Sequence, residues 1–402
     1  MGELTTYERA LTERVSAEPM LRRVELWSEI NSGSGNLSGL AMVAGALADC
    51  FSSLPGELRL LDPAPVTAVD AGGRELAVSH GQNLHLTVRP NAPVQLLFTG
   101  HMDTVYPADH PFQDLELRDD GVLGGPGVAD MKGGLAVMLA ALTAWEAATG
   151  AERIGYEVVI NSDEEVGSPG SAALIAQAAQ GKRAALTYEP AALPDGTLAG
   201  ARPGSGNFSF VVTGRAAHAG RNPEDGRNAV VAAADLALRL RRLTATGLSV
   251  NVARLDGGGP NNVVPDRAVL RVNLRPVDDE RQARAEAGIV SAVAEVARGH
   301  EVAIHPHGGF GRPPKPMTHE MERLFRLVKG AGDDLGQPIA WQPSGGVCDG
   351  NNIAACGVPV VDTMGVRGGK IHSEEEYLIV GSLPERAALS ALTMARLAGE
   401  VA

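Results

Sequence analysis

The chain has 402 residues, 44% of them hydrophobic and 21% charged, which is enough for two or three core-forming units at roughly 150 residues per domain. Its 35 lysines and arginines against 48 aspartates and glutamates give a net charge of −13, which argues against nucleic acid as a partner. Apolar runs such as 135–145 are shorter than the roughly 20 residues that span a membrane. The chain has three cysteines without a C-x-x-C pair, and its N-terminus is unlike a signal peptide. These features predict a cytoplasmic protein.

Short apolar runs alternate with longer alanine- and leucine-rich stretches, which is typical of strands joined by crossover helices. Core strands are predicted over residues 94–99, 156–160, 184–188 and 358–363. Helices are predicted over 133–148, which is apolar nearly all round and therefore buried, and over 171–180. The sequence predicts an α/β fold with a mixed, mostly parallel sheet flanked by helices.

From about residue 199 the pattern changes to amphipathic strands. Strands are predicted over 207–213, 249–254, 268–274 and 301–305, and helices over 228–243 and 279–298. This order predicts an inserted α+β domain with a four-stranded antiparallel sheet, which ends at a Gly/Pro-rich hinge over 308–314. We therefore expect one domain from 1–198 and 313–402, closing with a helix over 384–399, and a second from 199–312.

Acid and imidazole side chains follow the predicted strands. His101 and Asp103 come directly after the first core strand, so His101 can bind a metal while Asp103 fixes the imidazole from behind. A turn in which Asp103 accepts backbone N–H groups is the alternative. Asp130 follows a glycine-rich stretch before the buried helix, either as an N-cap or as a bridging carboxylate.

Glu164 and Glu165 follow the second core strand in an acidic stretch that could also be a solvated loop. Adjacent glutamates allow one to bind a metal and the other to take a proton from water. Glu189 follows the third strand, and His372 lies in a late loop. Together with His101, Asp130 and Glu165, they supply two imidazoles and three carboxylates, a set that suits a two-zinc site with one bridging carboxylate.

These motifs resemble, over nearly the whole chain, the di-zinc peptidase and deacylase family of glutamate carboxypeptidase, acetylornithine deacetylase, succinyl-diaminopimelate desuccinylase and aminoacylase. The resemblance rests on Gly-His-x-Asp-Thr-Val, Ala-Asp-Met-Lys-Gly-Gly and Asp-Glu-Glu-x-Gly-Ser. It implies two Zn²⁺ per chain, for which Co²⁺ or Mn²⁺ could substitute. It assigns the metal ligands as His101, Asp130 (bridging), Glu165, Glu189 and His372, with Asp103 orienting His101 and Glu164 as general base.

The resemblance also implies an inserted domain that forms a homodimer. Glu189 as the fourth ligand favours carboxypeptidases and deacylases over aminopeptidases. His218 resembles the histidine that polarises the scissile carbonyl, often in the partner subunit's site. Arg275 and Asn262 resemble residues that bind the carboxylate of the substrate. Gly345 and Gly346 belong to a segment that resembles a glycine-rich loop whose backbone approaches the substrate closely.

The resulting hypothesis is metal-assisted hydrolysis of an amide next to a free carboxylate, in a peptide or an N-acyl amino acid. Glu164 deprotonates a water held between the two ions, and His218 helps to stabilise the oxyanion. The alternatives are a dipeptidase acting on small unblocked peptides and a non-catalytic relative that binds its ligand. A serine hydrolase is disfavoured because the chain has no Gly-x-Ser-x-Gly elbow.

Overall fold

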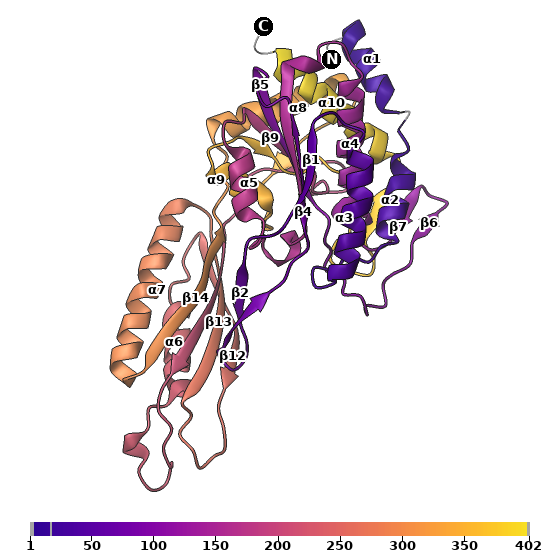
Figure 1. Ribbon diagram of the computed structural model, residues 1–402. Helices are drawn as coiled ribbons and strands as arrows, with labels where there is room; N and C mark the ends of the chain where they lie inside the picture. Colours follow the sequence, from indigo (N-terminus) through magenta and orange to yellow (C-terminus); the bar gives the residue numbers. More distant parts are fainter. Residues whose placement is uncertain (1–3, 17, 400–402) are drawn as a thin grey trace.

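The computed structural model describes residues 4–16 and 18–399. Figure 1 shows a larger upper lobe of helices around a sheet and a longer, narrower lower lobe of strands and helices. The lower lobe is formed by the middle of the chain, and the upper lobe by the segments before and after it. The α/β class with a separate antiparallel sheet is therefore confirmed.

The upper lobe is built on a six-stranded sheet. In spatial order its strands are β1 (Glu57–Leu61), β4 (Asn83–Val88), β8 (Ile154–Asn161), β5 (Val94–His101), β9 (Ala184–Thr187) and β16 (Val360–Val361). The last four are parallel to one another, and β4 is antiparallel to both β1 and β8. The four predicted core strands are all present, although β16 is shorter than predicted.

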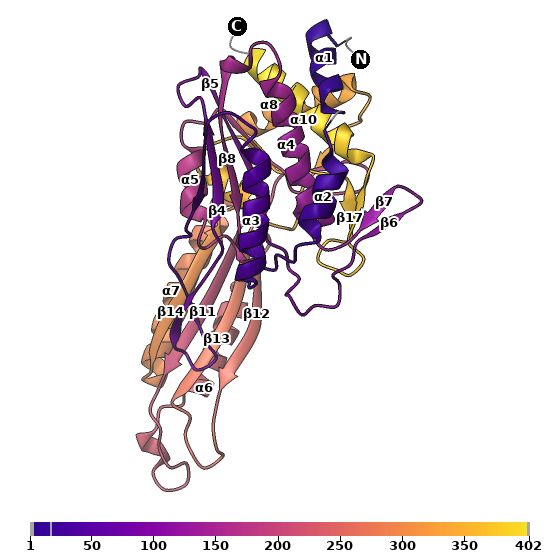
Figure 2. The same cartoon turned by 45° about the vertical axis from the view of Figure 1, so that its right-hand side comes forward.

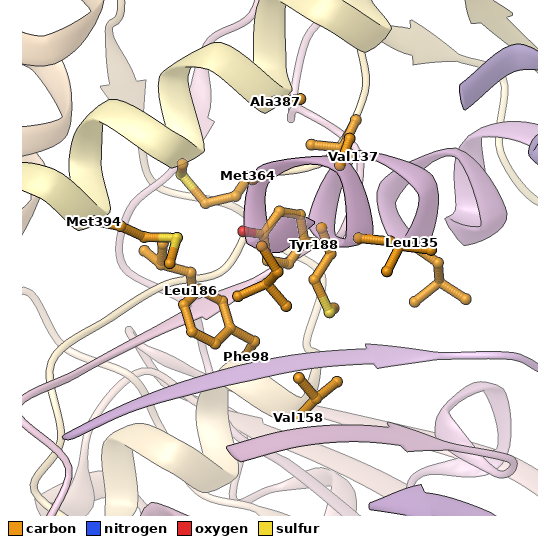
Figure 3. Close-up of a cluster of buried hydrophobic side chains, with 14 of the residues drawn as sticks. Phe98, Leu135, Val137, Val158, Leu186, Tyr188, Met364, Ala387 and Met394 are labelled. Carbon is orange, nitrogen blue, oxygen red and sulfur yellow. The ribbon is translucent and has the colours of Figure 1, made fainter. Parts of the chain in front are cut away.

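Helices surround this sheet. They are α1 (Thr6–Val15), α2 (Met20–Ser28), α3 (Leu37–Phe51), α4 (Gly133–Glu146), α5 (Ala172–Ala179), α8 (His319–Asp334), α9 (Asp349–Ala355) and α10 (Ser382–Gly399). Of these, α1 and α2 pack on other helices of the lobe. Figure 3 shows side chains of α4 and α10 meeting those of β5 and β9, among them Leu135, Met394, Phe98 and Leu186. As predicted, α4 is buried nearly all round, because it packs against α10, α2 and α1 as well as the sheet.

The segment Val128–Glu146 has the length and apolar composition of a membrane span, but 94% of that window is buried inside the protein. It comprises a π-helical turn, η1 (Val128–Lys132), and α4. Its apolar character is therefore accounted for by packing in the core. The cytoplasmic location stays a prediction.

Smaller elements complete the upper lobe. A four-stranded sheet contains β17 (Gly368–Gly369), β18 (Tyr377–Ile379), β7 (Val122–Gly124) and β6 (Glu116–Arg118), in that order. A parallel pair joins β10 (Leu198–Ala199) to β15 (Trp341–Gln342). Short 3-10 turns are η2 (Ala151–Arg153), η3 (Glu164–Val166) and η4 (Pro223–Asp225), the last of which lies in the lower lobe.

The lower lobe has the predicted strand–helix–strand–strand–helix–strand order. Its elements are β11 (Ser205–Thr213), α6 (Ala229–Arg241), β12 (Leu248–Gly257), β13 (Arg267–Pro276), α7 (Asp279–His300) and β14 (Ala303–Arg312). The strands form an antiparallel sheet in the order β12-β13-β11-β14. Both helices pack on this sheet around a core of their own. The boundaries at 198/199 and 312/313 stay predictions.

The predicted hinge over 308–314 is wrong for most of its length. β14 continues through it to Arg312 and stays paired with β11, with a register shift beside Ser205. Gly308 has a φ of +90°, and a Cβ there would lie 2.2 Å from the Asn207 carbonyl oxygen. The glycine is thus needed for close strand pairing, and only the two prolines 313–314 lie beyond the strand.

A hairpin from the upper lobe packs on the lower lobe. It consists of β2 (Val66–Val69) and β3 (Glu75–Val78), and it extends downward beside the lower sheet (Figure 2). Val69 forms a small apolar cluster with Val211 of β11 and Val269 of β13. Arg271 donates from Nη2 to the Val69 carbonyl oxygen at 2.9 Å. The lobes are therefore held together by packing as well as by their covalent connections.

Candidate active site

The predicted site residues gather at the carboxyl edge of the upper sheet. His101 is the last residue of β5, Glu164 and Glu165 begin the η3 turn just after β8, and Glu189 lies two residues beyond β9. Because β5, β8 and β9 are parallel, their carboxyl ends meet at one edge. The topology thus brings together residues that lie far apart in the sequence.

Asp130 belongs to η1, the turn before α4. Its backbone is non-helical, with a φ of −116° and a ψ of 91°, and its side chain makes no capping hydrogen bond. The N-cap interpretation is therefore wrong. Glu376 holds this turn in place, since its carboxylate accepts the N–H groups of Gly127 at 3.2 Å and of Ala129 and Asp130 at 3.0 Å each.

The Asp130 carboxylate lies between the two histidines. Its Oδ1 is 3.1 Å from His101 Nε2, and its Oδ2 is 3.4 Å from His372 Nε2. Glu189 Oε2 lies 3.7 Å from the same nitrogen of His101, whereas Glu165 Oε2 lies 3.2 Å from that of His372. Two groups of one histidine and one glutamate therefore share Asp130, which is the arrangement that a bridging carboxylate requires.

The cluster concentrates negative charge that bound cations would offset. Burial raises the pKa of Glu164 to about 7, and burial together with the charge of Asp130 raises that of Glu165 to about 8. Hydrogen bonds to Asp130 and Glu165 raise the pKa of His372 to about 11. Four buried or nearly buried carboxylates face two imidazoles, a costly concentration of negative charge. Nitrogen and oxygen donors of this kind fit divalent metal ions.

Asp103 contacts more than the predicted imidazole. His101 Nδ1 lies 3.0 Å from the Asp103 backbone oxygen and 3.4 Å from its carboxylate. The carboxylate accepts the N–H groups of Glu164 and Glu165, each at 3.1 Å, and the Ser34 hydroxyl at 2.7 Å. A proton on Nδ1 would leave Nε2 free to bind a metal. Asp103 therefore orients both His101 and the turn that carries the two glutamates.

Two clefts meet at this cluster. A cavity of about 440 Å³ within the upper lobe is lined in part by Ala199, Arg202 and Thr363. A wider cleft of about 1060 Å³ between the lobes is lined in part by Asn273 and Arg275. The residues that line both are Glu164, Glu165, Gly346, Val347 and His372. An extended substrate with its central bond at the cluster could therefore place one half in each cleft.

The predicted substrate-binding residues divide into two groups. Arg275 lies in the cleft between the lobes, where it donates to Asn273 Oδ1 and to the Gly345 carbonyl oxygen, each at 3.1 Å. The Gly346 carbonyl oxygen accepts from Arg202 at 3.1 Å. These residues of the lower sheet and the glycine-rich loop come together beside the cluster of carboxylates and imidazoles.

His218 and Asn262 are not brought to the cluster within this chain. His218 is exposed, in the loop that follows the far end of β11, and the Asn262 carbonyl oxygen accepts the Ala219 N–H at 2.9 Å in the same region. The start of β11 borders the cleft. At about 3.4 Å per residue, its far end lies roughly 27 Å away.

Sequence reasoning missed several buried charges around the site. Arg312 lies 2.7 Å from Glu164 Oε1. Arg202 and Lys315 pair with Asp362 at 2.7 and 2.9 Å, behind the cavity wall. Each of these residues is isolated in the sequence, without a motif around it, so only the fold reveals the pairs. The acidic run at 374–376 is the one signal that could have pointed to Glu376.

Comparisons with known proteins agree with this geometry. The model of Peptidase family M20/M25/M40 matches residues 97–396. Carboxypeptidase G2 of Pseudomonas sp. (strain RS-16) is 30% identical over 383 residues, covering 92% of this chain and 88% of that protein. A succinyl-diaminopimelate desuccinylase of Xanthomonas oryzae pv. oryzae is 30% identical over 383 residues, covering 90% and 97%. The solved aminopeptidase PepT of Bacillus cereus shares the fold, with a TM-score of 0.70, 24% identity, and coverage of 96% and 99%.

Proposed function

The chain belongs to peptidase family M20/M25/M40, and we propose that this hydrolase cleaves an amide bond next to a free carboxylate, in a peptide or an N-acyl amino acid. The resemblance seen in the sequence is thereby confirmed at the level of the family. Two relatives support the choice of substrate class, because carboxypeptidase G2 and the desuccinylase are named for such bonds.

The observation that carries the proposal is the sharing of Asp130 by two sets of donors. His101 and Glu189 would hold one ion, His372 and Glu165 the other, with Asp130 between them. We propose Zn²⁺, with Co²⁺ or Mn²⁺ as substitutes. When bound, the ions would supply Lewis acidity toward the scissile carbonyl and toward water.

Glu164 is the remaining carboxylate of the cluster and the proposed general base. Its backbone N–H is fixed by Asp103 at 3.1 Å, and its side chain lines both clefts. In this position it can take a proton from the attacking water and pass it to the leaving amine, a general base and then a general acid in one group.

Arg275 is the proposed partner of the carboxylate of the substrate. Its guanidinium lies at the wall of the cleft between the lobes, where charge-assisted hydrogen bonds would fix the amino-acid half of the substrate. The other half would then enter the 440 Å³ cavity, whose size is in the range of ligand pockets.

His218 would act in a homodimer. Because it lies at the far end of the lower lobe, we propose that it reaches the active site of the partner subunit, with Asn262 beside it. Such a dimer would form through the inserted domain. Sedimentation velocity would measure the mass, and mixing two inactive variants, one at His218 and one at Glu164, should restore part of the activity.

The first test pairs metal analysis with turnover. Protein purified without chelator should contain close to two zinc ions per chain and should hydrolyse members of a panel of N-acyl amino acids, C-terminal glutamyl peptides and unblocked dipeptides. The Glu164→Gln variant should keep its metal and lose turnover by about 100-fold or more. Absence of stoichiometric metal after addition of zinc, cobalt or manganese would overturn the proposal. Turnover of unblocked dipeptides alone would favour the dipeptidase alternative.

A further inference from the structure

Arg312 joins the inserted domain to the proposed general base. It is the last residue of β14, paired with Ser205 of β11, so its backbone belongs to the lower sheet. Its side chain is directed into the upper lobe and is only 7% exposed. A charged side chain at that depth requires partners that offset the cost of leaving water.

Most of those partners lie around the η3 turn. Nη2 donates to the Glu164 carbonyl oxygen at 2.9 Å and to the Ser168 hydroxyl at 3.0 Å, and it lies 2.7 Å from Glu164 Oε1. Nη1 donates to the Val347 carbonyl oxygen at 3.3 Å. One guanidinium therefore contacts both the backbone and the side chain of Glu164, which fixes the residue at two points.

Asp349 holds the guanidinium from the other side. Its Oδ1 lies 3.4 Å from Arg312 Nη2 and accepts the Ser168 hydroxyl at 2.5 Å. Its Oδ2 accepts Asn161 Nδ2 at 2.9 Å. Asn161 is the last residue of β8, so Arg312 is anchored to the strand from which the Glu164 turn begins.

The contact between Arg312 and the Glu164 carboxylate is a buried ion pair. Although Oε1 is 2.7 Å from Nη2, it makes no hydrogen bond with any described residue, and neither does Arg312 Nε. The attraction is therefore mainly between charges, while the directed hydrogen bond goes to the Glu164 backbone. The ion pair and the backbone hydrogen bond together fix the orientation that a general base needs.

We propose that Arg312 is a positioning residue, supplied by the inserted domain, that holds Glu164 in the orientation in which it accepts a proton. The inference rests on the proposed function, because it takes Glu164 as the base. It adds that the inserted domain contributes to catalysis within its own chain, in addition to any role in dimerisation or substrate binding.

The test compares Arg312→Ala and Arg312→Lys with the exposed control Arg326→Ala. A misplaced base should lower kcat by about 100-fold in Arg312→Ala, with KM and metal content close to wild type. Guanidinium chloride at non-denaturing concentration should restore part of the loss in Arg312→Ala and none in wild type. Arg312→Lys keeps a cation beside Asp349 and should fold and recover part of kcat.

A second readout does not depend on turnover. In metal-free protein, amide hydrogen exchange over residues 164–168 should be faster in Arg312→Ala than in wild type or Arg326→Ala. If wild type hydrolyses nothing in the panel but this exchange increases, the proposed function fails and the positioning role stands. Unchanged exchange over this segment would overturn the inference. So would a kcat close to wild type, or a loss that follows global unfolding and that guanidinium does not reverse.

Discussion

Replacing Asp362 by asparagine should destabilise the upper lobe strongly. Asp362 is fully buried and accepts from Arg202 Nε at 2.7 Å and Nη2 at 3.2 Å, and it pairs with Lys315 Nζ at 2.9 Å. Burial alone would raise the pKa of Asp362, but the charges of Arg202 and Lys315 outweigh it and hold that pKa below its usual value. Asp362→Asn leaves both cations buried beside a neutral amide.

The expected loss is about 3–5 kcal/mol of unfolding free energy, the range for breaking a buried ion pair by removing one partner. That is a large part of a total stability of about 5–15 kcal/mol. Urea unfolding of metal-free protein measures it without a contribution from metal binding. The control is Glu322→Gln, which removes the exposed pair with Arg326 and should cost no more than about 0.5 kcal/mol.

Two further measurements separate charge from packing. Lys315→Met in the Asp362→Asn background should recover part of the loss, because one buried cation is then removed. A carboxylate whose pKa is lowered in the folded state stabilises the protein above its unfolded pKa of about 3.9, and this contribution is lost as the pH falls through the lower folded value. The difference between wild type and Asp362→Asn should therefore shrink below about pH 4. A loss under about 1 kcal/mol at neutral pH would refute the reasoning.

Three further predictions concern the site. Glu376→Gln should weaken zinc binding, measured by competition titration, by about 10- to 100-fold. An amide cannot accept the three backbone N–H groups of the Asp130 turn as the carboxylate does. The control Glu375→Gln, at an exposed neighbouring position, should have no effect. Arg275→Ala should lower kcat/KM by roughly 10- to 100-fold for carboxylate substrates and far less for their methyl esters, whereas equal losses would make the residue structural. N-succinyl amino acids should be hydrolysed at least about tenfold less efficiently than N-butanoyl ones. Most N–H groups of Arg202 already bond Asp362, Gly346 and Ser344, and Lys370 pairs with Glu375 in solvent. Equal rates would contradict this prediction.

The strand ends explain why so much of the site could be predicted. His101, Glu165 and Glu189 each follow a short apolar run, and parallel strands place such positions at one edge whatever their separation in sequence. Asp130 required the structure, because its glycine-rich surroundings and the helix after it are equally typical of an N-cap. Only the contact with Glu376 and the non-helical backbone decided between the two.

Long-range pairs account for what the sequence could not predict. Arg312 is preceded by glycines that lower strand propensity, so the sequence over 308–314 predicted a hinge. Pairing with β11 nevertheless extends β14 to Arg312. The β2–β3 hairpin contacts residues about 140 to 200 positions later. No local pattern encodes a partner at that distance, because periodicity indicates which face of an element is apolar but not what covers it.

The lower lobe lies in the sequence between β9 and β16, two neighbouring strands of the upper sheet. The ribosome therefore synthesises the upper sheet in two stages. β9, whose four residues are all buried, pairs on one side with β5 and on the other with β16. β16 leaves the ribosome roughly 170 residues later, or about 10 to 30 seconds at usual elongation rates. During that interval an apolar strand edge has no partner, and such edges invite pairing with other chains. Folding of the upper sheet before β16 is synthesised would therefore expose the nascent protein to aggregation through this edge.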